Sequence, residues 1–135
     1  GDVLEITFGE KKMKFKVNRK VMLEHLKSMY KVVPKSSTVQ ELKGFLLEAN
    51  EDDGYVYMTA NNLEAAVQRK FKADIEIGGG FIVEARMLIK RARKNANVLI
   101  ECFIVYWTID YVKGLRFLYF FILSGLFSRN SFISF

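Results

Sequence analysis

Alternating apolar and basic residues mark the first clear element, and a helical pattern follows directly. Residues 13–17 (MKFKV) have the period-two alternation of a half-buried β-strand. Asn18 is a residue type that caps helices, and Pro34 disfavours helical geometry in the residue before it. Between them, one apolar face recurs at helical spacing: Met22, Leu26, Met29 and Val33. The pattern predicts a helix that starts near Arg19 and ends before Pro34.

Strand signals return after a polar loop. Residues 45–49 and 55–60 are strand-like, and the sequence EDDG at positions 51–54 is typical of the turn between two antiparallel strands. Residues 65–77 predict one or two more strands. The three glycines at positions 78–80 are expected to turn the chain.

A second helical pattern covers residues 85–94, with Leu88 and Ala92 facing inward, and residues 98–100 begin a last strand. The order is therefore strand, helix, several strands, helix, strand. This order predicts an α+β fold in which both helices pack on one face of a mainly antiparallel sheet.

Both predicted helices carry basic residues opposite their apolar faces. The basic positions are Lys20, Lys27 and Lys31 on the first helix, and Arg86, Lys90, Arg93 and Lys94 on the second. One such helix would mean little, because amphipathic helices commonly solvate their outer face with lysines. Two on the same side of a sheet make a broad cationic surface, and the net charge of +6 agrees with an acidic partner. Regularly spaced phosphates would fit such a surface without base reading, so the pattern indicates duplex DNA.

Catalytic and metal-binding patterns are missing from the sequence. Cys102 is the single cysteine, and His25 is the single histidine, so the usual metal-ligand sets cannot be assembled. We expect His25 at the surface. The glycines at 78–80 are not followed by the Lys-Ser/Thr of a phosphate-binding loop. No spacing suggests a nucleophile with its base. We therefore expect a non-enzymatic protein without metal or cofactor.

Residues 1–20 have no apolar signal core, which predicts a cytoplasmic location.

Four segments in order resemble the beta subunit of bacterial DNA polymerase III, the sliding clamp. They are MKFKVNR at 13–19, VQELKGFLLEA at 39–49, YMTANNLE at 57–64, similar to the family's LTATDLE, and VEARMLI at 83–89, similar to its VPARxL. The resemblance covers residues 13–101 and implies the first of three domains. Asn61-Asn62 and Gln40-Glu41 depart from the usual residues of the family.

The resemblance implies a function without chemistry. In the family, two head-to-tail subunits form a ring whose helices line the hole around DNA, and the clamp tethers the polymerase. It also implies three protein partners: a second clamp subunit, the clamp loader and the polymerase. The groove that binds polymerase peptides lies between the two domains that follow the first. Carried onto this sequence, the DNA-facing residues are Lys20, Lys27, Lys31, Lys35, Arg86, Lys90, Arg93 and Lys94. Lys35 comes from the loop after the first helix, which carries a DNA-contacting basic residue in the family.

Two segments lie outside the resemblance. Residues 1–12 precede it and are an extra strand, an upstream extension or a cloning remnant. Residues 102–135 contain 3 Lys and Arg, 1 Asp and 11 aromatic residues, a composition unlike that of the preceding domain. An out-of-frame or premature end of a clamp gene would explain this tail. The domain prediction is thus 1–12, 13–101 and 102–135.

Two other functions stay open at this stage. The first is a small basic module for RNA or single strands, which would need aromatic residues on an exposed sheet. Phe15, Phe45 and Tyr57 instead have a spacing that suits a core. The second is membrane attachment through the tail, but residues 115–127 include Arg116 and fall short of the ~20 residues that span a bilayer. Membrane binding is therefore not expected.

Overall fold

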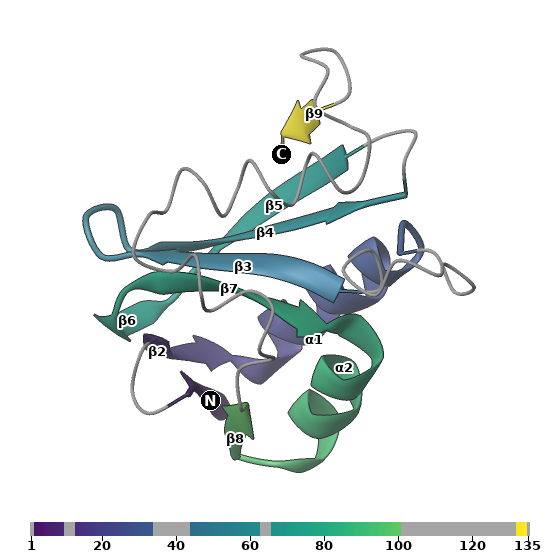
Figure 1. The fold of residues 1–135 in the computed structure, drawn as a ribbon. Helices are drawn as coiled ribbons and strands as arrows, with labels where there is room; N and C mark the ends of the chain where they lie inside the picture. The colour runs from purple at the N-terminus through teal and green to yellow at the C-terminus, as the bar shows by residue number, and fades with distance from the viewer. Residues whose placement is uncertain (1, 10–12, 34–43, 63–65, 101–131, 135) are drawn as a thin grey trace.

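The computed structural model of the 135-residue chain describes residues 2–9, 13–33, 44–62, 66–100 and 132–134. Figure 1 shows the elements in order. They are β1 (Val3–Phe8), β2 (Met13–Asn18), α1 (Arg19–Tyr30), β3 (Gly44–Asn50), β4 (Tyr55–Asn61), β5 (Ala66–Lys72), β6 (Asp74–Ile77), β7 (Gly79–Glu84), α2 (Ala85–Lys94), β8 (Asn97–Ile100) and β9 (Phe132–Ser134).

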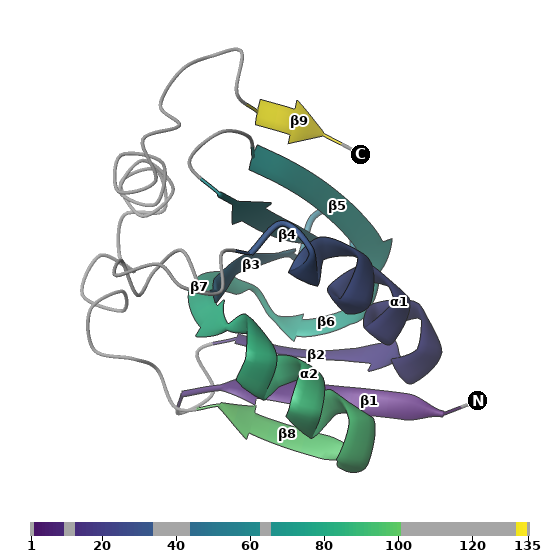
Figure 2. The same ribbon diagram turned by 90° about the vertical axis from the view of Figure 1, so that its right-hand side faces the viewer.

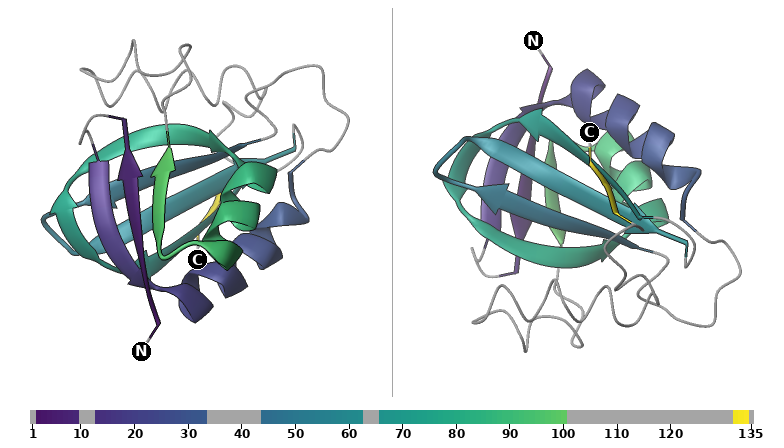
Figure 3. Two further views of the ribbon diagram at one scale, coloured as in Figure 1. Left: turned by 90° about the horizontal axis from the view of Figure 1, so that it is seen from below. Right: turned by 90° about the horizontal axis from the view of Figure 1, so that it is seen from above.

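The strands form two sheets, and the two helices lie side by side against them (Figures 2 and 3). One sheet has the order β6-β2-β1-β8 and the other β7-β3-β4-β5-β9. All neighbouring strands are antiparallel except β1 with β8 and β5 with β9. The predicted α+β fold is confirmed, with the strands divided between two sheets where the sequence suggested one. The division arises because Ala73 separates β5 in the second sheet from β6 in the first.

Both helices begin where the sequence places them. The Asn18 side chain accepts a hydrogen bond from the Val21 amide at 3.0 Å and so caps α1. The first helix ends at Tyr30, earlier than predicted, because the amides of Val32 and Val33 bond to carbonyls three residues back in a closing turn. Val33 is nevertheless buried. Val33 therefore faces the core as predicted, although it lies beyond the end of the helix.

The predicted hairpin between β3 and β4 forms, but the glycine run behaves differently from the prediction. Gly54 has a positive φ of 76° in the hairpin turn, a conformation that glycine adopts without strain. Of the three later glycines, only Gly78 separates β6 from β7, and Gly79 and Gly80 begin β7. They pair there with Ala49 and Glu48. The predicted turn is therefore confined to Gly78, whose amide bonds the Glu51 carboxylate at 2.9 Å.

Residues 3–8, which precede the family resemblance, form a central strand of the first sheet. β1 lies between β2 and β8, so of the three alternatives for the segment the structure shows a strand. Leu4, Ile6 and Phe8 are at most 1% exposed. The ring of Phe8 stacks on Phe81 of the other sheet, with centroids 5.4 Å apart. β1 therefore helps to join the two sheets.

The core lies where the sheets and helices meet. Phe15 and Phe45 are fully buried as predicted, together with the inward faces of α1 and α2. Tyr57 is different: it is only partly buried, and its hydroxyl donates a hydrogen bond to Asp53. This hydrogen bond lowers the pKa of Asp53 and raises that of Tyr57. The expectation that Tyr57 is a core residue is wrong, because its position on β4 faces away from the helices.

Candidate nucleic-acid interface

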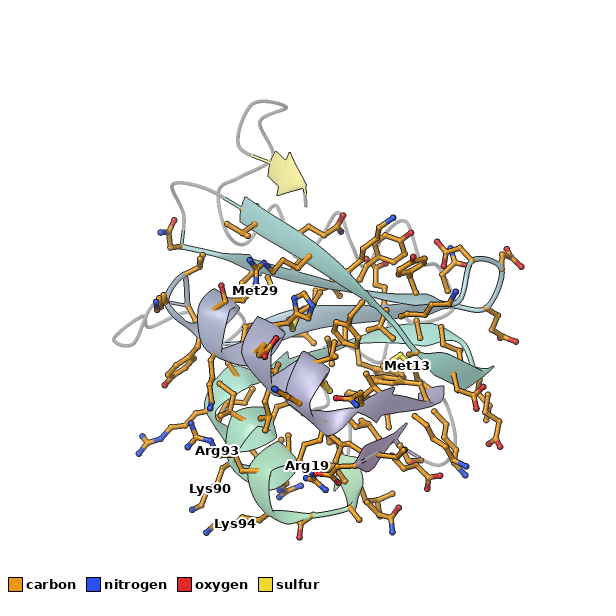
Figure 4. All side chains as sticks on the ribbon, turned by 180° about the vertical axis from the view of Figure 1, so that it is seen from behind. Met13, Arg19, Met29, Lys90, Arg93 and Lys94 are labelled. Atoms are coloured by element: carbon orange, nitrogen blue, oxygen red, sulfur yellow. The ribbon has the colours of Figure 1, made fainter. Side chains whose placement is uncertain are left out.

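The two helices run in opposite directions, and their outer faces meet at a basic groove. Arg19 begins α1 and contacts the end of α2, which sets the antiparallel arrangement. Lys90, Arg93 and Lys94 project outward from α2 (Figure 4). The groove has a volume of about 500 Å³. Its lining residues are Lys27, Tyr30, Arg86, Ile89, Lys90, Arg93 and Lys94.

Five of the seven lining side chains are cationic, and none is acidic. In the described ranges, the ion pairs join Lys14 to Glu76, Lys16 to Glu5 and Arg19 to Asp2, so none engages a groove cation. The groove cations are all exposed. Their charges therefore face solvent along both helices.

The C-terminus of α2 favours these charges. Arg93 and Lys94 belong to its last turn, together with Arg91. Cations in this position interact favourably with the partial negative charge of the helix end. Arg91 itself points elsewhere, since it donates to the Leu99 carbonyl of β8 at 3.1 Å.

The structure brings some of the predicted DNA-facing residues together and not others. Lys27, Arg86, Lys90, Arg93 and Lys94 share the groove. Lys20 and Lys31 are exposed on or next to α1 but do not line it. Lys35 lies outside the described residues. Tyr30 and Ile89 also line the groove and were not among the predicted residues; only their positions on the helix edges could have indicated them.

Arg19 is a positioning residue that the sequence did not reveal. Its guanidinium donates to the carbonyl oxygens of Ala92 and Asn95, the latter at 2.9 Å, and its Nε lies 2.6 Å from the Asp2 carboxylate. The side chain of Arg19 is 15% exposed, whereas that of Asp2 is 64% exposed. Arg19 thus joins the start of α1 to the end of α2 and fixes the spacing between the two basic faces.

Replacing Arg19 with Met is expected to destabilise the domain by about 1.5–3 kcal/mol, because it removes two charge-assisted bonds to backbone carbonyls, of which the bond to Ala92 is partly buried. Chemical denaturation measures the loss. Asp2→Asn is the matched control and should cost at most about 1 kcal/mol, since its side chain is exposed. Equal costs for the two variants would show that Arg19 acts mainly through Asp2.

His25 lies away from the groove and is less exposed than the sequence suggested. Its ring stacks on Phe71 of β5 with centroids 5.4 Å apart. Within the described residues, the buried Nδ1 has no hydrogen-bond partner. Burial, followed by the nearby positive charge of Arg69, lowers the pKa of His25 below 6.5, so the side chain is neutral at pH 7. His25 therefore adds no charge to the surface.

The described part of the chain presents neither a metal cluster nor a membrane-spanning helix. Among the residues that the structure places, no group of three or more His, Cys, Asp or Glu side chains is arranged to hold a metal ion. Within the same ranges, neither helix has the length and apolar character needed to cross a bilayer.

The arrangement defines a class of protein: an α+β domain of the DNA-clamp fold, in which two sheets support a pair of adjacent helices. A sequence profile described as DNA polymerase III beta subunit, N-terminal domain, matches residues 13–104. The chain belongs to this family, which is non-catalytic.

Solved sliding clamps share the fold. The DnaN sliding clamp from Bartonella birtlesii, solved bound to griselimycin, is 30% identical over 61% of this chain, with a TM-score of 0.56. The Caulobacter crescentus beta sliding clamp is 26% identical over 61%, with a TM-score of 0.57. The clamp from Bacillus subtilis, at 20% identity and a TM-score of 0.56, supports the fold alone. The match covers 22% of the Bartonella chain, about the share of a single domain. No curated protein matches the sequence.

Proposed function

We propose that this domain binds the phosphate backbone of duplex DNA, without base reading, through the groove between α1 and α2. The observation that carries the proposal is the set of five cations from two helices around one groove that has no acidic lining residue. Phosphates carry a regular array of negative charge that such a surface neutralises by releasing counterions. Lys20, Lys31 and Lys35 are proposed to extend the contact beyond the groove.

The distribution of aromatic side chains favours a duplex over a single strand. Tyr30 is the single aromatic residue of the groove lining. Tyr55 is on β4, and Lys70 covers its ring with the ammonium group 4.6 Å from the centroid. A single-strand binder needs open aromatic faces beside its cations. Here the groove cations lie on the helices. On the sheet, Lys70 already covers the ring of Tyr55.

Binding to duplex DNA is expected to be weak, indifferent to sequence and strongly dependent on salt. Fluorescence anisotropy with two labelled duplexes of unrelated sequence measures this over a range of salt concentrations. Each phosphate contact contributes about −0.9 to the slope of log affinity against log salt. If all five groove cations make contact, the slope approaches about −4.5. A flat salt response, or a clear preference for one sequence or for single strands, would refute the proposal.

We further propose that the domain serves as the first domain of a cytoplasmic sliding clamp. The match covers about a fifth of the length of the solved clamps, so a ring requires further domains besides this one. The partners proposed from the family are a second clamp subunit, the clamp loader and the replicative polymerase. In such an assembly the groove would face the DNA inside the ring.

The 135-residue chain by itself is expected to leave circular DNA at high salt. A closed ring holds DNA by topology, whereas an open surface holds it by contacts that salt screens. Gel filtration of the chain with nicked circular DNA, at low and high salt, tests this. Retention at high salt that disappears when the DNA is linearised would show that the chain closes a ring unaided.

A further inference from the structure

The domain contains two related halves, and their comparison makes the position of β1 unusual. Strand β2 and helix α1 correspond to β7 and α2 at a constant separation along the chain. The matching pairs are Phe15 with Phe81, Val17 with Val83, the N-caps Asn18 with Glu84, Met22 with Leu88, and Leu26 with Ala92. Apart from the caps, every member of these pairs is buried. The second half therefore repeats the strand-helix unit of the first.

The repeat predicts which strands should be neighbours. After α1 the chain forms β3, which pairs antiparallel with β7, the strand before α2. By the same rule, β8, which follows α2, should pair with β2, which precedes α1. In the structure β1 occupies that place, and β8 lies one position farther out at the edge of the sheet.

β1 and β8 are interchangeable in direction and in side-chain pattern. The two strands are parallel, and β1 is antiparallel to β2, so both have the direction that the place beside β2 requires. Their register aligns Ile6 with Val98 and Phe8 with Ile100, all buried. Because this register preserves the side-chain alternation, β8 can shift sideways without turning an apolar residue to solvent.

We propose that the edge of β2 is a strand-binding site that β1 and β8 fill alternatively. The site accepts an extended segment that runs antiparallel to β2 and has apolar side chains at every second position. In the state observed, β1 fills it, and in the other state β8 pairs directly with β2 and residues 3–8 are released. The exchange restores the symmetry between the two halves.

Packing explains why β1 is the occupant observed. It has six residues and buries Leu4, Ile6 and Phe8, whereas β8 has four and buries Val98 and Ile100. Phe8 adds its stacking contact with Phe81. The exchanged state is therefore the less populated one.

Disulfide trapping in the full-length chain distinguishes the two states. Lys16 pairs with Glu5 of β1, and Glu5 pairs with Asn97 of β8. Lys16 and Asn97 are thus two strand spacings apart, about 9.6 Å, beyond the ~7 Å between Cα atoms that a disulfide spans. After exchange they become direct neighbours. The test variant is Lys16→Cys with Asn97→Cys, in a Cys102→Ser background.

Two control pairs make the rate of bond formation interpretable. Glu5→Cys with Lys16→Cys reports the observed state and should close rapidly. Lys31→Cys with Asn97→Cys joins opposite ends of the helix pair, about 18 Å apart by the length of α1, so it closes only by extensive unfolding.

In a glutathione buffer well below the unfolding temperature, the Lys16–Asn97 bond is expected to form at least about tenfold faster than the Lys31–Asn97 bond, because local opening requires less free energy than global unfolding. Leu4→Ala, which weakens β1, should increase this ratio. Equal rates for the two pairs would overturn the proposal, since the bond would then report unfolding alone. Failure of the Glu5–Lys16 control would overturn it as well, because β1 would not occupy the site.

Discussion

Reversing the charge of Lys90, Arg93 and Lys94 to Glu is expected to abolish measurable binding to duplex DNA. These three side chains project outward from α2 (Figure 4) and line the groove, which has no acidic lining residue. The reversal removes three attractive interactions with phosphates and adds three repulsive ones. At about 1 kcal/mol for each attraction removed, affinity should fall at least about 100-fold. Any binding that survives should have a salt slope reduced by about 0.9 for each phosphate that is no longer neutralised.

A matched variant separates the contribution of the groove to DNA affinity from that of the net charge. Lys16, Lys70 and Lys72 are exposed on strands. Their reversal to Glu changes the total charge by the same amount as reversal of the three groove residues. Each triple variant lowers the formal charge from +6 to 0, since every reversal removes two units. We expect the strand variant to keep most of its affinity. An equal loss in both variants would show that overall charge, rather than the groove, binds DNA.

Replacing Phe8 with Ala is expected to destabilise the domain by about 3–5 kcal/mol, the usual cost of removing a buried phenyl ring. The ring is 1% exposed and stacks on Phe81 across the two sheets, so its loss leaves a cavity at their junction. Since whole domains are stable by about 5–15 kcal/mol, such a variant should be close to unfolding. Urea denaturation followed by circular dichroism measures the change.

Val3→Ala is the control for this second prediction. Val3 belongs to the same strand but is 52% exposed, so the substitution should change stability by about 0.5 kcal/mol or less. A Phe8 variant as stable as the Val3 variant would contradict the placement of β1 in the core.

Local sequence patterns predicted the helices well because each depends on neighbouring residues. The cap Asn18 and the apolar face that includes Met22 and Leu26 are encoded within four turns of chain. The start of α2 at Ala85 follows in the same way from its own residues. The cationic character of both outer faces was likewise predictable, because charge opposite an apolar stripe must face solvent.

Pairing between distant strands was not predictable from these patterns. Residues 3–8 alternate like any half-buried strand, and no local feature indicates that they pair with β8, which lies at the other end of the described domain. The division into two sheets has the same origin, since it depends on which strands become neighbours once β5 ends and β6 begins on either side of Ala73. Tyr57 was wrongly predicted to lie in the core. Alternation assigns residues to the two faces of a strand but does not show which face the helices cover.

The sequence by itself determined the family, the α+β class, the helix boundaries to within a turn and the basic residues that face outward. Only the tertiary structure decided which of those residues share a groove, and it did so by placing α1 against α2 in opposite directions. Lys27 and Lys90 are far apart along the chain, and the contacts of Arg19 with Ala92 and Asn95 bring their helices together. Helical periodicity assigns each side chain to a face of its own helix. The distance between two faces depends on packing, which arises when the whole domain folds.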